Sequence, residues 1–125
     1  MRKSANLFVT AASATTLMLS ALVVISTNVA HAADAKALEE GKEITFHRQK
    51  GNCLACHKID GGDLPGNIGP ELVNMKARYP DKAKLRAQIW DATTTNPNTI
   101  MPPFGKHKLL TEKEIDLVTD YIYSL

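Results

Sequence analysis

The amino-acid sequence predicts an all-α domain, and three observations carry this prediction. Apolar residues recur at helical spacing in three segments after residue 32. No segment there shows the sustained alternation of apolar and polar residues that is typical of strands. Two long segments rich in glycine and proline separate the helical ones, as expected for loops.

Residues 1–32 have the organisation of a secretory signal peptide. Two basic residues follow the initial methionine, residues 17–25 form a mostly apolar stretch, and the segment closes on small side chains at Ala30 and Ala32. A retained membrane anchor is the alternative, but polar residues leave no stretch near the ~20 apolar residues that a span needs. We therefore expect cleavage near Ala32 and an exported domain over residues 33–125, with no membrane contact after cleavage.

The predicted mature domain has balanced charge. Because Arg2 and Lys3 lie in the leader, 13 of the 15 basic residues remain beside all 13 acidic ones. A formal net charge of zero removes the electrostatic basis for nucleic-acid binding. Only 36 of its 93 residues are apolar, so a domain this small needs a disulfide, a metal or a cofactor to hold its core.

Each predicted helix has its own local signals. The first is expected over residues 35–49, before Gly51. The second follows Asp81, which can cap it, and ends in residues 93–97, where threonines and a proline disfavour helix. The third begins with a capping box formed by Thr111 and Glu114. An apolar stripe lies on one face of this helix and consists of Ile115, Val118, Ile122 and Leu125.

The two segments between these helices are predicted to be loops. Residues 58–79 contain repeated glycines and prolines and are too broken for a helix, and residues 93–110 hold three prolines. Loops of this length inside a small domain need an explanation. A large apolar cofactor supplies one, because irregular chain can be ordered by wrapping around it.

The cysteines identify that cofactor. The chain has two, Cys53 and Cys56, and His57 follows directly. Cys-x-x-Cys-His is the attachment signature of a c-type haem, in which two thiols add to the haem vinyl groups and the next imidazole becomes the proximal iron ligand. We therefore predict one covalently attached haem c, held by Cys53 and Cys56, with His57 as an iron ligand.

Other uses of this motif remain as alternatives. A disulfide between Cys53 and Cys56 closes so short a loop that it stabilises little. A dithiol redox motif is expected beside a βαβ unit, and no strand pattern flanks it. A zinc site needs four ligands, with only His47 and His107 left as further imidazoles in the mature chain.

A second axial ligand is predicted in the second loop. Met75 and Met101 are the methionines of the mature chain, and a methionine often faces a proximal histidine across the iron. Met101 is favoured because prolines stiffen its loop, whereas Met75 is more simply a core residue. His47 and His107 are the remaining, disfavoured candidates. With both axial positions filled, the iron is suited to electron transfer rather than to substrate binding.

The proximal histidine also needs a hydrogen-bond partner. We expect the carbonyl of Pro70 to accept from the second ring nitrogen of His57 and so to fix the ring; an ordinary turn proline is the alternative. Trp90 is expected to pack in the core or against the haem, rather than to donate its N–H to a haem carboxylate.

Longer strings resemble a known family. Over the whole mature chain the sequence resembles a class I cytochrome c, and more closely the X subunits of the sulfur-oxidising (Sox) cytochrome complexes. The resemblance rests on residues 51–57, 65–70, 85–92, 96–105 and 110–112. The spacing from Gly41 to Phe46 departs from the usual i, i+4 pair of simple cytochromes c, which leaves the contact between the first and last helices open.

The resemblance implies a role as well as a fold. It implies a periplasmic electron-transfer subunit, paired as a heterodimer with a larger haem-bearing A subunit. Together they would form an L-cysteine S-thiosulfotransferase, which joins thiosulfate oxidatively to a cysteine of a carrier protein. The catalytic cysteine-ligated haem would belong to the A subunit, no catalytic residue to this chain, and electrons would pass to a soluble cytochrome.

One feature follows from this reading, and one alternative stays open. An apolar patch at the haem edge, including Ile100, Pro102, Pro103 and Phe104, is expected to dock the partner chain. The alternative is a free-standing periplasmic cytochrome c shuttle, which would meet its redox partners through lysines near the haem edge.

Overall fold

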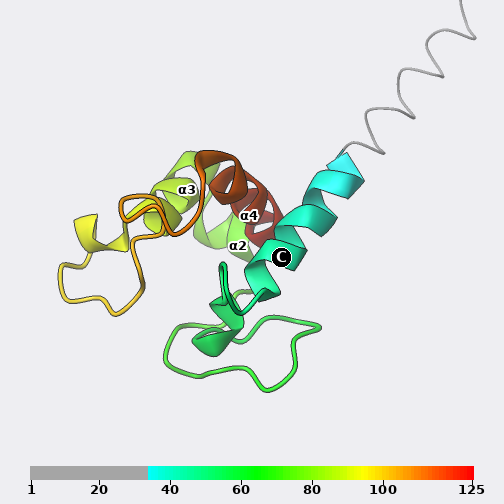
Figure 1. Cartoon of the computed structure of the whole chain (residues 1–125), viewed down its shortest axis with the longest axis horizontal. Coiled ribbons are helices and arrows are strands. Elements are labelled where there is room, and N and C mark those ends of the chain that lie inside the picture. The colour runs from blue at the N-terminus through cyan, green and yellow to red at the C-terminus, as the bar shows by residue number, and fades with distance from the viewer. Residues whose placement is uncertain (1–33) are drawn as a thin grey trace, which may run out of the picture. The chain divides into compact units, whose positions relative to one another are not determined.

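The computed structural model describes residues 34–125, which form one compact unit (Figure 1). The helical segments of this unit are residues 34–46, η1 (Cys53–Ala55), α2 (Met75–Arg78), α3 (Lys82–Trp90), η2 (Ala92–Thr94) and α4 (Glu112–Ser124). Residues 34–125 contain no strand, so the all-α prediction is confirmed. The predicted signal peptide lies outside the described residues, and none of the described helices is long and apolar enough to cross a membrane.

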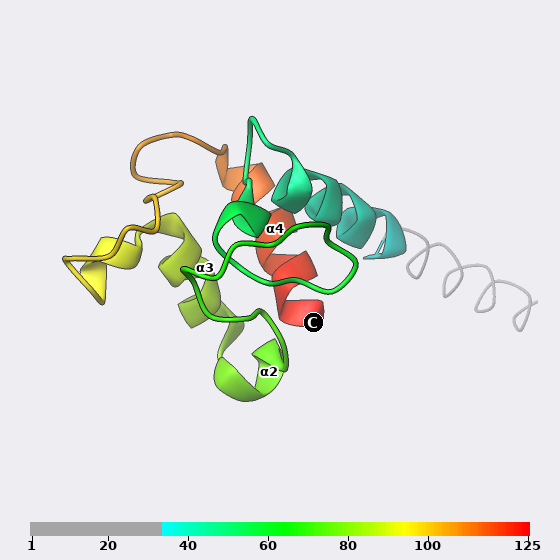
Figure 2. The same cartoon turned by 90° about the horizontal axis from the view of Figure 1, so that it is seen from below.

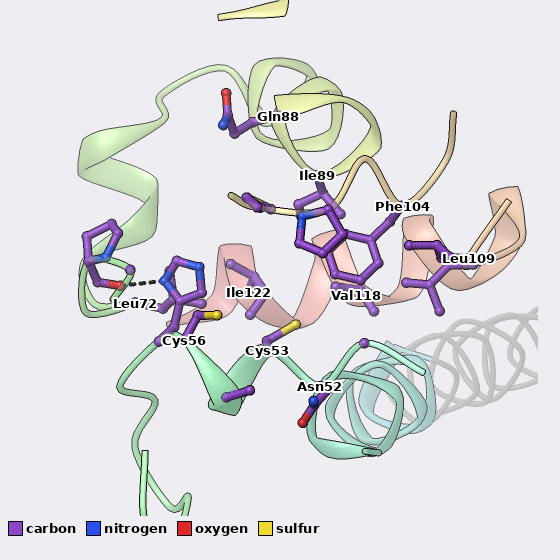
Figure 3. Close-up of a pocket in the computed structure, with 18 of the residues that line it drawn as sticks. Asn52, Cys53, Cys56, Leu72, Gln88, Ile89, Phe104, Leu109, Val118 and Ile122 are labelled. Atoms are coloured by element: carbon purple, nitrogen blue, oxygen red, sulfur yellow. Dashed lines mark hydrogen bonds between the residues drawn. The ribbon is translucent and has the colours of Figure 1, made fainter. Parts of the chain in front are cut away.

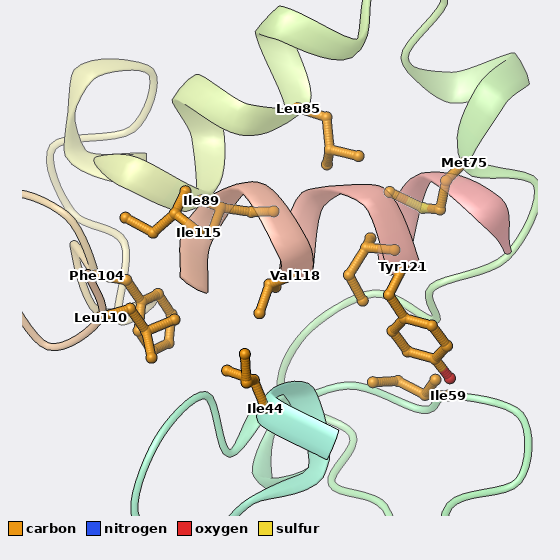
Figure 4. Packing of buried hydrophobic residues seen from close by; sticks show 11 residues of the cluster. Ile44, Ile59, Met75, Leu85, Ile89, Phe104, Leu110, Ile115, Val118 and Tyr121 are labelled. Atoms are coloured by element: carbon orange, nitrogen blue, oxygen red, sulfur yellow. The ribbon is translucent and has the colours of Figure 1, made fainter. Parts of the chain in front are cut away.

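Helix α4 is the centre of the fold. Its first turn has the predicted capping box: Thr111 Oγ1 accepts from Glu114 N at 3.2 Å, and Glu114 Oε2 accepts from Thr111 N at 3.0 Å. The buried face of α4 is lined by Ile115, Val118, Thr119, Tyr121 and Ile122. Figure 4 shows this face between the side chains of α3 and Ile44 of the N-terminal helix.

A glycine contact joins residues 34–46 to α4. A Cβ atom on Gly41 would lie 2.1 Å from the carbonyl oxygen of Leu117, so only glycine permits this backbone approach. One turn later Thr45 is fully buried and donates its hydroxyl to the Gly41 carbonyl at 2.7 Å. Phe46 meets Tyr121 with ring centroids 6.2 Å apart. Four residues after Gly41 the chain therefore has a threonine, and the aromatic ring of Phe46 follows one residue later.

Two predicted boundaries differ from the structure. The first helix ends at residue 46 rather than 49, because the chain turns back and Gly51 N donates to Ile44 O at 3.1 Å. Helix α3 ends at Trp90, and the chain continues as the short helix η2. The expected cap at Asp81 is present, since its side chain accepts from Ala83 N at 2.9 Å.

Helix α2 lies in a segment that was predicted to be entirely loop. It follows Asn74, whose φ of 53° is in the left-handed region, which asparagine tolerates better than most residues. The amide of Met75 donates to the carbonyl of the last residue, Leu125, at 3.3 Å. Figure 2 shows α2 close to the C-terminal end of α4. This contact between distant segments gives no local sequence signal.

Candidate functional site

A cavity of about 560 Å³ lies among η1, the two long loops, α2, α3 and α4. Its volume is within the ~300–1,000 Å³ range of cofactor and ligand sites. Its apolar walls come from several elements: Leu72, Met75, Leu85, Ile89, Phe104, Val118 and Ile122. Figure 3 shows that the side chains of these elements converge on one space.

The sequence motif forms one wall of the cavity. Asn52 precedes η1 in the left-handed region with φ 46°, and His57 N donates to Cys53 O at 2.9 Å. This tight turn brings Cys53, Cys56 and His57 to the cavity lining together. Both cysteines are free thiols, and Figure 3 shows their sulfur atoms directed toward the space below Ile89 and Phe104. Burial raises the pKa of the Cys53 thiol to about 12.

The ring of His57 is held from one side. Its Nδ1 lies 2.6 Å from Pro70 O, the bond dashed in Figure 3. Since a carbonyl can only accept, Nδ1 carries the proton and donates, which leaves the lone pair of Nε2 available to a ligand. Gly69 lies against the ring, because a Cβ there would be 2.4 Å from His57 Cε1. The hydrogen bond expected from the sequence is therefore present, together with a glycine contact that the sequence did not reveal.

Both methionines border the cavity. Met75 belongs to the core with 2% of its surface exposed, and its sulfur lies 3.4 Å from the Arg78 guanidinium. Met101 lies in the long loop after η2, half-buried, with its amide donating to Thr99 Oγ1 at 3.2 Å. The two other candidate ligands, His47 and His107, are exposed and do not line the cavity.

The charged groups that line the cavity are all cations: Arg48, Lys50 and Arg78. Lys50 already pairs with Glu114 at 2.5 Å. Arg78 donates to Glu71 O at 2.7 Å, and its other contact is the weakly accepting Met75 sulfur. Its remaining donors suit a carboxylate. Sequence reasoning missed Arg78, because it lies in the segment predicted to be loop.

These residues fit a haem. Two thiols lie beside an imidazole whose Nε2 is available, a thioether lines the same cavity, the walls are apolar, and cations are available for the two haem carboxylates. The zinc alternative finds no support here: within residues 34–125 no three or more His, Cys, Asp or Glu side chains gather as a possible metal site. Four such ligands are usual for structural zinc.

Of two aromatic side chains, Phe104 has a role other than the expected one, whereas Trp90 packs against the core as expected. Phe104 was expected on an exposed docking patch, but this is wrong: it is 7% exposed, belongs to the core and lines the cavity. It is held there because Leu109 N and Leu110 N both donate to its carbonyl. Trp90 does not line the cavity, and its indole N–H donates to Glu112 Oε1 at 2.9 Å, which links α3 to α4.

The chain is similar to known cytochrome proteins. Residues 36–122 match the family described as cytochrome C oxidase, cbb3-type, subunit III. An uncharacterized lipoprotein of Aquifex aeolicus is 36% identical over 76 residues, which cover 60% of this chain and 37% of that protein. The fructose dehydrogenase cytochrome subunit of Gluconobacter japonicus is 34% identical over 79 residues, covering 58% of this chain and 16% of that protein. The match thus spans well under half of either relative's length.

Proposed function

The chain belongs to the cytochrome c family of cbb3-type oxidase subunit III, and we propose that it is the electron-transfer subunit of a periplasmic thiosulfate-oxidising enzyme. That it is an electron-transfer cytochrome c follows from the family itself. The further assignment, to the X subunit of a sulfur-oxidising pair, is our proposal. The observation that carries the electron-transfer part is the arrangement of His57 and Met101 on one cavity beside Cys53 and Cys56.

The proposed site works by holding a closed redox centre. Cys53 and Cys56 would bind the haem covalently, and the bound haem would supply reversible one-electron iron chemistry. His57 would present Nε2 to the iron while the Pro70 carbonyl, 2.6 Å from Nδ1, accepts the Nδ1 hydrogen bond, and Met101 would supply its thioether sulfur. The apolar walls exclude water, and a thioether ligand favours a high reduction potential. With His57 and Met101 both holding the iron, substrate chemistry would belong to a partner.

The sulfur-oxidising assignment is supported by the sequence strings around the motif, Pro70 and Met101 that resemble Sox X subunits. Both cysteines of the chain lie in the haem motif, so none remains to accept thiosulfate. We therefore propose that a larger haem-bearing A subunit performs the sulfur chemistry on a carrier-protein cysteine. This chain then passes the electrons to a soluble cytochrome. Export to the periplasm is proposed from the leader, and a lipoprotein among its relatives supports an exported protein.

We propose the cavity mouth as the surface that meets the A subunit. Ile68, Ile100 and Leu109 each line the cavity, yet are 65%, 68% and 52% exposed. Exposed apolar residues grouped around a site are typical of protein interfaces. A partner docked there also comes close to the haem, which a short electron path requires.

The experiment that tests this function uses the full tagged chain, purified from the periplasm of its own host grown on thiosulfate. Native mass measurement with haem staining should find a larger haem-bearing chain at one-to-one stoichiometry. Ile100→Asp should weaken that pairing at least tenfold, because a charge enters the apolar interface, and should leave the haem spectrum unchanged. Leu64→Asp is the matched control, since Leu64 is 96% exposed but does not line the cavity.

A lone, haem-positive monomer in that experiment would contradict the sulfur-oxidising assignment and support a second function, a free-standing cytochrome c shuttle. One observation bears on this alternative: a similar cytochrome subunit belongs to a fructose dehydrogenase, so related domains serve different redox enzymes and the similarity does not tie this chain to thiosulfate. A shuttle should react with its partners at rates that fall steeply with salt. Pairing with the A subunit that persists at high salt would argue against it.

A further inference from the structure

The segment that carries Met101 is closed at its base by a compact set of contacts. We call Trp90, Asp91, Gly105 and Lys106 the neck. The carbonyl of Trp90 accepts from Gly105 N at 3.0 Å and from Lys106 N at 3.3 Å. Gly105 also lies against the indole of Trp90, where a Cβ would be 2.0 Å from Cδ1. The neck thus joins the two ends of residues 92–104.

An ion pair between the buried carboxylate of Asp91 and the half-exposed ammonium group of Lys106 completes the neck. The side chain of Asp91 is 4% exposed, and its Oδ2 lies 2.9 Å from Lys106 Nζ. Its Oδ1 accepts from the amide of Thr93 at 3.0 Å and from the Thr93 hydroxyl at 2.5 Å. The Thr93 hydroxyl first, and Lys106 second, lower the pKa of Asp91. The carboxylate is therefore ionised, and Lys106 is the cation beside it.

The rest of the segment is held by its own hydrogen bonds, by one hydrogen bond to α3 and by packing against the core. Thr99 N donates to Asn96 O at 3.0 Å, Asn98 N to Asn96 Oδ1 at 3.1 Å, and Met101 N to Thr99 Oγ1 at 3.2 Å. Thr95 Oγ1 donates to Gln88 Oε1 of α3 at 2.7 Å, and the buried Phe104 packs in the core. The neck closes the base of the segment, so the placement of Met101 over the cavity depends on the neck together with these contacts.

We propose that the Asp91–Lys106 pair is a clasp that positions Met101 as an axial ligand. The inference rests on the proposed Met101 ligation. A thioether is a weak, neutral ligand. The fraction of time it spends bound to the iron therefore depends on how often the loop that carries it opens. Removing Lys106 leaves a buried carboxylate without its cation, which favours any movement that exposes Asp91 to water. The loop should then open more often, and the methionine should leave more often.

Imidazole binding to the ferric holoprotein tests the clasp, because imidazole can replace the methionine only when the loop opens. Lys106→Met should raise the limiting rate of imidazole binding about fivefold to 30-fold, the factor that corresponds to ~1–2 kcal/mol. Asp91→Asn should also raise the limiting rate of imidazole binding. Lys106→Arg should restore the wild-type rate, since it keeps the charge beside Asp91. Lys108→Met is the matched control: an exposed lysine two residues away that makes no salt bridge within residues 34–125.

The outcomes separate this inference from the function on which it rests. A wild-type protein without the spectral signature of thioether ligation overturns the Met101 assignment itself. A wild type with that signature, and equal imidazole rates in wild type and Lys106→Met, overturns the clasp alone. Equal increases in Lys106→Met and Lys108→Met also overturn it, because they would reflect lost surface charge. A faster rate in Lys106→Met, with Lys106→Arg and Lys108→Met at the wild-type rate, supports the clasp.

Discussion

Met101 and Met75 show how two residues of the same type can differ in role at one cavity. Met75 is rigidly packed in the core, on a helix, beside a guanidinium 3.4 Å from its sulfur. A thioether beside a cation is a poorer donor to iron, since the cation competes for its electron pair. Met101 lies on a half-buried loop without such a neighbour in the described contacts of residues 34–125.

Replacing Met101 is therefore expected to change the iron site and little else. Met101→Ala should abolish the spectral signature of thioether ligation in the ferric state and lower the reduction potential, because a ligand that favours the ferrous form is lost. Absorption spectroscopy and a redox titration measure both effects. Met75→Leu is the control, expected to keep the signature at a stability cost below about 1.5 kcal/mol. A signature that survives in Met101→Ala and disappears in Met75→Leu would reverse the assignment.

His57 shows how far a single residue depends on its neighbours. The Cys-x-x-Cys-His motif predicts the ligand from three residues, but the imidazole ring can bind iron only in one orientation. Pro70 and Gly69 set that orientation, by a hydrogen bond of 2.6 Å and by close packing. The proline could be inferred from the need for an acceptor. The glycine contact could not, because it depends on the path of the loop.

Among the helices, α4 was the most completely predicted. Its capping box, its apolar stripe and its bounds are all encoded within consecutive residues. Helix α2 was not predicted, since its four residues have no periodic pattern and are stabilised by α4 and by Leu125. Short helices of this kind depend on tertiary packing rather than on their own propensity.

Glu114, in the first turn of α4, should make the stability of the protein depend on pH in the acidic range. The ammonium group of Lys50, followed by the amide of Thr111, lowers the pKa of Glu114 to about 2. Since the pKa is below its ordinary value of 4.5, the ionised Glu114 stabilises the fold above pH 4.5, and this contribution is lost as the pH falls toward 2. At pH 7, Glu114→Gln should lower the melting temperature by about 2–4 °C, since the pair is partly exposed.

Thermal unfolding followed by circular dichroism between pH 7 and pH 3 measures this effect. The difference between wild type and Glu114→Gln should shrink as the pH falls. Glu43→Gln is the control, because Glu43 is exposed and makes no salt bridge within residues 34–125. A constant difference down to pH 3 would show that the charge of Glu114 is not what stabilises the helix.

The domain as a unit is built around a space that its own side chains do not fill. Met75, Leu85, Ile89, Phe104 and Val118 line the cavity of about 560 Å³ and also belong to the core. Without a bound group, these apolar side chains face water instead of an apolar surface, which removes burial that a domain of this size needs for stability.

The chain without its haem should therefore fail to fold cooperatively. The double variant Cys53→Ala/Cys56→Ala should lose much of the helical far-UV signal of the holoprotein and show no sharp thermal transition. Circular dichroism of both proteins at the same concentration measures this. A cooperative transition in the double variant near the melting temperature of the holoprotein would show that the core closes without the haem.

Local chemistry was enough to predict the all-α fold, the haem motif, the capping box of α4 and the acceptor for His57. Each of these depends on residues close in sequence or on a requirement of a known group. The position of Phe104 in the core, the Gly41 contact with Leu117, helix α2 and the pair of Asp91 with Lys106 became visible only in three dimensions. These features join segments far apart in the chain or depend on how a loop is closed. The spacing of residues in the sequence does not determine the distance between two such segments in space.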